Sequence, residues 1–145
     1  MRTTEILLAD DNPADTDLTG EVLSRSGHPS HIHSVTNGAE AIAFLRREGK
    51  FAHALRPDFV ILDLNLPKKD GRAVLAEVKA DPVLRKIPIA IFSTSEARQD
   101  IVRSYELGAN CYVSKPGNLQ HFISAVTSIG EFWFGLARLP REENL

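Results

Sequence analysis

Short apolar runs alternate with amphipathic stretches along the whole chain. The apolar runs predict strands at residues 5–9, 31–35, 59–63, 89–92 and 111–114. Most of them are continuous rather than alternating, which is typical of strands buried on both faces of a parallel sheet. The run from His31 to Val35 is more polar, so we expect that strand nearer to a sheet edge.

A helix is predicted after each strand. Side chains suited to N-capping stand before three of the helices: Asn12, Asn37, and Thr94 or Ser95. The last helix is expected to start near Asn118. The third helix contains Val74, Leu75 and Val78 and ends before Pro82. Asp15 lies in the first turn of the first helix, where a negative charge suits the helix dipole.

This alternation predicts an α/β fold with right-handed crossovers and a parallel sheet covered on both faces. A chain of 145 residues is long enough to bury one core. Five strand–helix units account for residues 1–127. Residues 128–145 exceed that requirement and are expected to extend the last helix into a tail.

The end of the chain is rich in aromatic residues. At helical spacing, one stripe expected to face the sheet contains Leu119, Phe122, Ile123, Val126 and Trp133. Phe132 lies off this stripe and Phe134 lies near its margin. Exposed aromatic residues usually mark a partner surface, so we expect a homodimer built on the last helix and Phe132, Trp133 and Phe134. The alternative is a tail that folds back onto its own domain.

Composition narrows the function classes. The net charge is −2 without a long basic block, which argues against nucleic acid as a partner. The chain has no apolar run of about 20 residues, so no membrane partner is expected. No signal peptide is visible at the start, and the single cysteine fits a reducing compartment. We therefore expect a cytoplasmic protein.

Charged or hydroxyl side chains stand at the carboxyl ends of four of the predicted strands. Asp10 and Asp11 follow the first strand, Asp63 ends the third, Ser93 follows the fourth and Lys115 follows the fifth. In open α/β folds this edge of the sheet is the usual ligand site.

Carboxylates gathered in one pocket repel each other, and Mg²⁺ relieves that repulsion through oxygen ligands. A carboxylate beside the metal can attack a phosphoryl group. Lys115 would neutralise charge on that group, and the Ser93 hydroxyl could hydrogen-bond its oxygens.

Four motifs together resemble the receiver domain of response regulators in two-component signalling, over about residues 4–127. They are Asp10-Asp11, Asp63 to Gly71, Ser93-Thr94-Ser95 and Tyr112 to Pro116. Residues 65–72 and 131–140 are also similar to the small stand-alone regulators that serve bacterial and cyanobacterial phytochromes. The resemblance implies a flavodoxin-like (βα)5 sandwich with strand order 2-1-3-4-5.

The resemblance also implies roles for individual residues. Asp63 would accept a phosphoryl group from a sensor histidine kinase, here of the phytochrome type. Mg²⁺ would be held by Asp10, Asp11, Asp63 and the backbone carbonyl of Asn65. Lys115 would contact the phosphoryl group, and the peptide bond between Lys115 and Pro116 would be cis.

The switch implied by the resemblance consists of Ser93 and Tyr112. Their movement would change the surface formed by the fourth helix, fifth strand and fifth helix. Asn65, Thr94 and Ser95 would tune phosphoryl-group stability. The chain would be a signalling protein rather than an enzyme, with self-catalysed phosphotransfer, slow autodephosphorylation and no attached output domain.

Three other functions are weighed against this one. A Mg²⁺-dependent phosphohydrolase with an aspartyl nucleophile would need a second Asp where Asn65 stands, and a cap domain. A flavin or nucleotide site would need a glycine-rich loop after the first strand. A zinc site could involve His28, His31 and His33, but no Cys or acidic third ligand is near them in the sequence.

Overall fold

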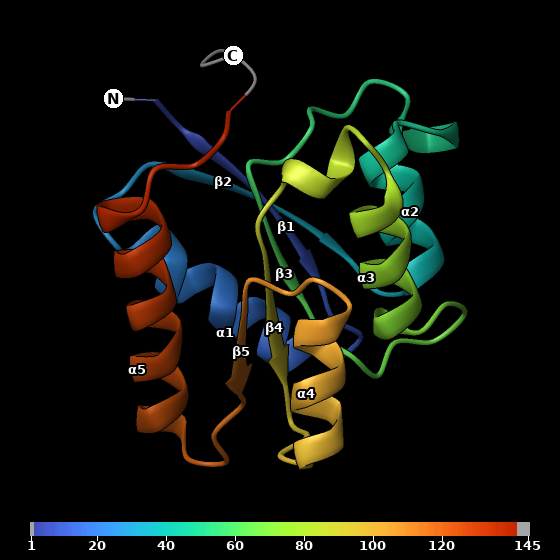
Figure 1. Ribbon diagram of the computed structural model, residues 1–145. Helices are drawn as coiled ribbons and strands as arrows, with labels where there is room; N and C mark the ends of the chain where they lie inside the picture. The colour runs from blue at the N-terminus through green and yellow to red at the C-terminus, as the bar shows by residue number, and fades with distance from the viewer. Residues whose placement is uncertain (1, 142–145) are drawn as a thin grey trace.

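The computed structural model describes residues 2–141 and contains one parallel sheet (Figure 1). Its five strands have the order β2-β1-β3-β4-β5, as expected. They are β1 (Thr4–Ala9), β2 (Ser30–Val35), β3 (Phe59–Leu62), β4 (Ile89–Ser93) and β5 (Cys111–Ser114). The central strands are buried, whereas β2 and β5 form the two edges and are partly exposed.

Helices cover both faces of the sheet, which gives a three-layer sandwich (Figure 1). Helices α1 (Pro13–Ser24) and α5 (Leu119–Gly130) pack together on one face. The other face carries α2 (Gly38–Arg46), α3 (Gly71–Ala80) and α4 (Arg98–Glu106). Short 3-10 turns occur at Gly49–Phe51 and Leu84–Lys86.

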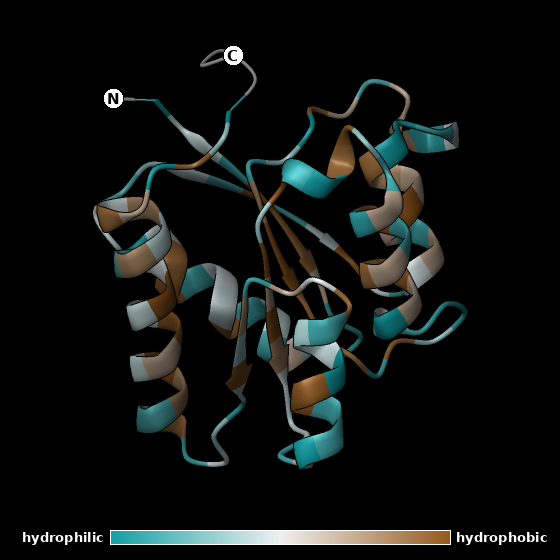
Figure 2. Cartoon of the chain, in the orientation of Figure 1, coloured by the Kyte–Doolittle hydropathy of each residue, from teal (hydrophilic) through white to brown (hydrophobic). Residues whose placement is uncertain are grey.

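The strands divide the core into two apolar layers. Leu7, Val60 and Ile89 belong to the layer under α2 and α3. Ile6 and Phe59 belong to the layer under α1 and α5. Figure 2 shows the hydrophobic strands at the centre and hydrophilic segments on the outer sides of the helices. This two-sided burial explains why the strand sequences are continuous apolar runs.

Two of the predicted caps are confirmed, and a third cap forms at Asn118, near the predicted start of the last helix. The side chains of Asn12, Asn37 and Asn118 each accept a backbone hydrogen bond in the first turn of their helices. The cap predicted for the fourth helix is wrong, because α4 starts after Ala97 without a side-chain cap. The Ser95 hydroxyl instead donates to Asp100 Oδ2 at 2.6 Å, inside that helix.

The tail continues α5 as a π-helical segment, Glu131–Leu136. Its wider turn brings two consecutive aromatic rings onto Phe59 in β3, with centroid distances of 5.0 Å for Trp133 and 5.5 Å for Phe134. Phe132 remains 50% exposed. Two of the three aromatic residues expected in a dimer therefore pack on their own chain, and the homodimer itself stays a prediction.

Two details differ from expectation. Leu119 is 62% exposed although it was placed on the sheet-facing stripe, because the first turn of α5 lies beyond the end of β5 (Figure 1). The Lys115–Pro116 bond is trans, the isomer that X–Pro bonds usually favour. Within residues 2–141, no helix combines the length and apolar character needed to span a bilayer.

Candidate functional site

The carboxyl edge of the sheet brings three carboxylates together. Asp63 follows β3, and its backbone N–H donates to the Ala9 carbonyl of the adjacent β1 at 3.0 Å. That pairing sets Asp63 beside Asp10 and Asp11, which follow β1. One oxygen from each of the three carboxylates lies within 4.8 Å of the other two. Asp10 and Asp63 are buried, while Asp11 is exposed.

Lys115 reaches this cluster from the end of β5. Its Nζ donates to Asp10 Oδ2 at 2.7 Å and to Asp63 Oδ2 at 3.1 Å. The side chain is only 3% exposed. Burial alone would lower the pKa of Lys115, but the hydrogen bonds to Asp10 and Asp15 and the charge of Asp63 outweigh it, so the pKa lies above its ordinary value. Lys115 is therefore a fixed positive charge.

Asp15 is a fourth carboxylate of the site, and the sequence reasoning missed it. Its Oδ2 accepts a hydrogen bond from Lys115 Nζ at 3.0 Å. Asp15 was interpreted only as a helix-dipole residue. The available signal was Asn12, whose side chain caps α1 by accepting the Asp15 N–H and so fixes Asp15 in the first turn, close in sequence to Asp10 and Asp11.

Asp10 is the most deeply buried acid of the cluster. Its Oδ1 accepts the Asn12 N–H at 2.9 Å, and the residue is 4% exposed. Burial raises the pKa of Asp10 above its usual value, although the hydrogen bond from Lys115 opposes that shift. A single ammonium thus faces several carboxylates, an excess of negative charge that a divalent cation would offset.

The loop from β3 to α3 closes tightly over Asp63. The Asn65 N–H donates to Asp63 Oδ1 at 3.3 Å, while the Asn65 side chain is exposed. Gly71 packs where a Cβ would lie 2.1 Å from the Asp63 carbonyl oxygen. Only glycine fits there, so the loop and the acid are held in one arrangement.

Ser93 is the last residue of β4, and Thr94 follows it at the same edge of the sheet as the carboxylates. Ser93 is fully buried, and its Oγ accepts the Ser95 N–H at 3.3 Å. The Lys115 N–H donates to the Ser93 carbonyl at 2.7 Å, which ties β4 to the lysine. Thr94 is exposed.

A hydrogen-bonded chain leads from this edge to α4. The Tyr112 hydroxyl of β5 donates to the Ser95 carbonyl at 2.8 Å, so its ring lies inward over the β4–α4 loop. The Ser95 hydroxyl bonds Asp100, which also pairs with Arg72 of α3 at 2.8 Å. The hydrogen bonds from Ser95 and Arg72 lower the pKa of Asp100, so it stays ionised.

Comparisons with known proteins agree with this geometry. The family model of the response regulator receiver domain matches residues 6–127. Response regulator Rcp1 of Synechocystis sp. is 43% identical over 93% of this chain and 92% of its own length.

Two solved structures are similar over nearly the whole chain. The Mn²⁺-bound form of Rcp1 has a TM-score of 0.93 and 42% identity, covering 95% of this chain and 99% of that one. The phosphorylated cyanobacterial phytochrome response regulator RcpA has a TM-score of 0.94 and 48% identity, covering 97% and 100%.

These matches exclude the phosphohydrolase and flavin-binding alternatives as the family of this chain. Receiver domains of two-component systems are phosphorylated by histidine kinases and bind a divalent cation, Mg²⁺ or Mn²⁺, at an acidic pocket. The chain belongs to the response regulator receiver family and is related to the phytochrome response regulators.

Proposed function

We propose that a phytochrome-type histidine kinase transfers a phosphoryl group to Asp63. The phosphorus–nitrogen bond of the kinase phosphohistidine would break as an Asp63 carboxylate oxygen bonds to phosphorus. The observation that carries this proposal is the convergence of Asp63, Asp10, Asp11 and Lys115 at one sheet edge. The phytochrome-type donor is inferred from the similarity to RcpA and Rcp1.

Mg²⁺ fits the donor set of this site. The side chains of Asp10, Asp11 and Asp63 offer oxygen ligands within 4.8 Å of one another, and the Asn65 carbonyl is proposed as a further ligand. When bound, the ion would offset the carboxylate charge and that of the incoming phosphoryl oxygens. Lys115 would then exchange its hydrogen bond with Asp63 for one with a phosphoryl oxygen.

We propose that the signal leaves through α4, β5 and α5. A phosphoryl oxygen would give the buried Ser93 hydroxyl an acceptor for its proton, and movement of Ser93 toward that acceptor would pull its oxygen away from the Ser95 N–H. Ser95 also holds Tyr112 and Asp100, so a shift of this loop would be felt at β5 and α4. Asn65, Thr94 and Ser95 stand in the loops after β3 and β4, and we propose that they tune loss of the phosphoryl group.

A homodimer is the second part of the proposal. An apolar groove of about 480 Å³ runs between the edge strand β5 and α5, and the exposed Phe132 forms part of its wall. Phe132→Ser should shift sedimentation toward monomer. Leu55→Ser, which changes a residue 60% exposed elsewhere, is the matched control. Equal sedimentation of the two variants would argue against this interface.

Phosphotransfer is tested directly with a radiolabelled, autophosphorylated phytochrome kinase and Mg²⁺. The label should pass to the wild-type chain and not to Asp63→Asn. Acetyl phosphate provides a kinase-free arm, in which mass spectrometry should find one added phosphoryl group that Asp63→Asn lacks. Labelling of Asp63→Asn at the wild-type level would refute the acceptor assignment. Faster labelling by an unrelated histidine kinase would refute the phytochrome assignment.

A further inference from the structure

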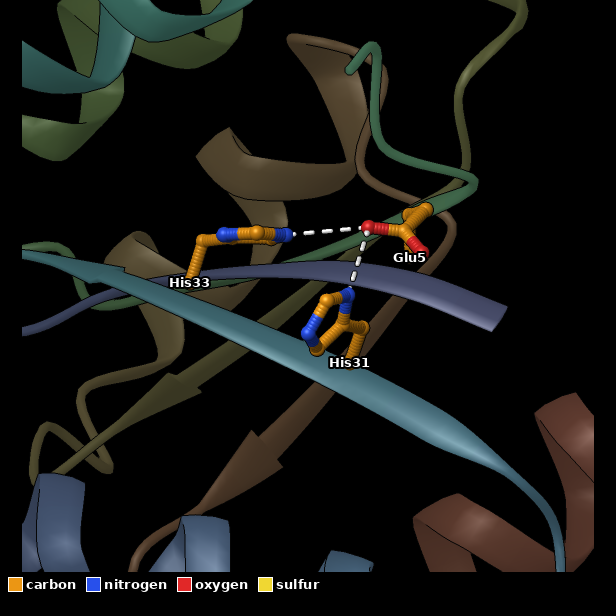
Figure 3. Close-up of side chains that lie close together, drawn as sticks. All are labelled: Glu5, His31 and His33. Carbon is orange, nitrogen blue, oxygen red and sulfur yellow. Dashed lines mark hydrogen bonds and ion pairs between the residues drawn. The ribbon is translucent and has the colours of Figure 1, made fainter. Parts of the chain in front are cut away.

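A second polar cluster lies on β1 and β2, toward the amino ends of the strands. The Glu5 Oε1 atom is 2.9 Å from His33 Nε2 and 3.5 Å from His31 Nδ1. Figure 3 shows both imidazole rings directed at this one carboxylate oxygen. Within residues 2–141, this is one of two groups of His, Cys, Asp or Glu that could hold a metal ion, the other being the acidic cluster.

Glu5 is the acidic third ligand that has no counterpart near the histidines in the sequence. His31 and His33 are two positions apart in β2, so their side chains lie on the same face of the sheet. Glu5 stands 28 positions before His33, and β1 pairs in parallel with β2 so that Glu5 is the register partner of His31. Strand pairing thus joins two imidazoles and a carboxylate.

The separations suit a single metal ion. Zinc bonds to His nitrogen and carboxylate oxygen at about 2.0–2.2 Å, so neighbouring tetrahedral ligands are roughly 3.3 Å apart. The two separations from Glu5, 2.9 and 3.5 Å, bracket that value, and all three ligand atoms lie within 4.8 Å of one another.

Packing holds two of the three ligands in place. The His33 ring lies against Phe44 of α2 with a centroid distance of 5.4 Å. The Glu5 side chain is 10% exposed, and its backbone N–H donates to the buried Asp58 at 2.9 Å. The His31 side chain, 68% exposed, leaves one side open to solvent for metal entry and a bound water.

We propose that Glu5, His31 and His33 form a binding site for a borderline divalent transition metal of the Zn²⁺ type. Two neutral imidazoles and one carboxylate, with water completing the coordination, are the donor set of many zinc sites. The bound ion would fasten the edge strand β2 to β1. Glu5 is five residues from Asp10 along the chain, about 16 Å in a strand, so this site is separate from the acidic pocket.

The test is a Zn²⁺ titration of the full chain by calorimetry, with excess Mg²⁺ present to occupy the all-oxygen acidic pocket. Wild type should bind one equivalent of Zn²⁺ that Glu5→Gln and His31→Ala bind at least about tenfold more weakly. Because His31 is exposed, His31→Ala should retain the fold, which circular dichroism would verify. His121→Ala, an exposed histidine on α5, is the matched control and should bind normally.

The outcomes separate the possibilities. Selective loss of zinc binding in Glu5→Gln and His31→Ala, with His121→Ala unaffected, would establish the site. Absence of zinc binding in wild type would overturn the proposal and leave the cluster as two histidines paired with the Glu5 carboxylate. Equal binding by wild type, Glu5→Gln and His31→Ala would also overturn it, by assigning the zinc to another site. None of these results depends on phosphorylation of Asp63.

Discussion

Strand β1 leads from a buried carboxylate near its amino end, Glu5, to another just past its carboxyl end, Asp10. At the carboxyl end the partner is Lys115, whose ammonium is held by several acids and is almost fully buried. At the amino end the partners are His31 and His33, whose rings supply nitrogen donors and are partly open to solvent.

The difference shows that the side chains beside each β1 carboxylate determine what that end of the strand can bind. An all-oxygen cluster with a fixed ammonium suits a hard cation and a phosphoryl group. A mixed nitrogen and oxygen cluster without that ammonium suits a borderline metal. Parallel pairing brings the residues together in both cases, and residue type sets the ligand.

Removing the buried ammonium should have the largest effect on stability. Lys115→Ala leaves Asp10 and Asp63 buried without their cation, and we expect a loss of about 3–5 kcal/mol in urea unfolding without metal. Mg²⁺ should restore part of it. At the other end, His33→Ala should cost less, about 2 kcal/mol, since it removes one hydrogen bond to a carboxylate and the ring contact with Phe44 but leaves no buried ion pair broken.

The exposed Lys86→Ala variant controls for the loss of a surface lysine. A Lys115→Ala variant as stable as Lys86→Ala would show that the two ends of β1 do not differ in this way.

Packing over the acidic end provides the next test. In Gly71→Ala the new methyl group meets the Asp63 carbonyl, and we expect a loss of up to about 3 kcal/mol together with slower phosphorylation. Gly117→Ala is the matched control, because its Cβ would meet no atom within 4 Å. Unfolding curves and acetyl-phosphate labelling of both variants measure the two effects. Equal stability and equal labelling of the two variants would mean that the β3–α3 loop has room for a methyl group at position 71.

The raised pKa of Asp10 predicts an effect with a defined pH dependence. A raised folded-state pKa means that this carboxyl contributes stability below its unfolded pKa, and that the contribution is lost as pH rises through the folded pKa. In metal-free buffer Asp10→Asn should therefore stabilise the protein at neutral pH, and the gain should shrink on acidification.

Asp81 gives the opposite case. Backbone hydrogen bonds from Leu84 and Val83 lower the pKa of Asp81, so its contribution is present at neutral pH and is lost as pH falls. Asp81→Asn should therefore destabilise at neutral pH. Melting temperatures measured between pH 3 and pH 7 in the presence of EDTA would distinguish the two variants, and a shared sign would contradict the assignment.

The smallest expected effect on stability concerns the hydrogen bonds that link the carboxyl edge of the sheet to α4 through Tyr112 and Ser95. Tyr112→Phe removes the hydrogen bond to the Ser95 carbonyl and should cost about 1 kcal/mol. Tyr105→Phe is the control, since Tyr105 is the other tyrosine and its hydroxyl accepts from the Tyr112 N–H. Amide exchange in α4, compared before and after phosphorylation, should respond less in Tyr112→Phe than in Tyr105→Phe. An unchanged response would remove Tyr112 from the switch.

The sheet and its acidic end were predictable because their signals are local. Continuous apolar runs mark buried strands, and an acid or lysine directly after such a run must lie at the sheet edge. Asn12, Asn37 and Asn118 mark helix starts by the same local logic.

The unpredicted features depend on contacts between distant segments. Asp15 became part of the site through the orientation of α1, and Glu5 became a partner of His31 through strand register. Ser95 does not cap α4 because the helix begins only at Arg98, and the Ser95 oxygen accepts the N–H of Ala97 instead of one inside the helix. The π-helical turn that brings Trp133 and Phe134 onto Phe59 changes the helical period on which the tail prediction relied.

The packing of Trp133 on Phe59 also has a practical use. Trp133 is the only tryptophan of the chain, so the intrinsic fluorescence excited at the red edge of protein absorption originates from this one ring. Emission wavelength and quenching by acrylamide therefore report whether the tail stays docked on β3. The same sample can follow that docking while acetyl phosphate reacts at Asp63, at the other end of β3.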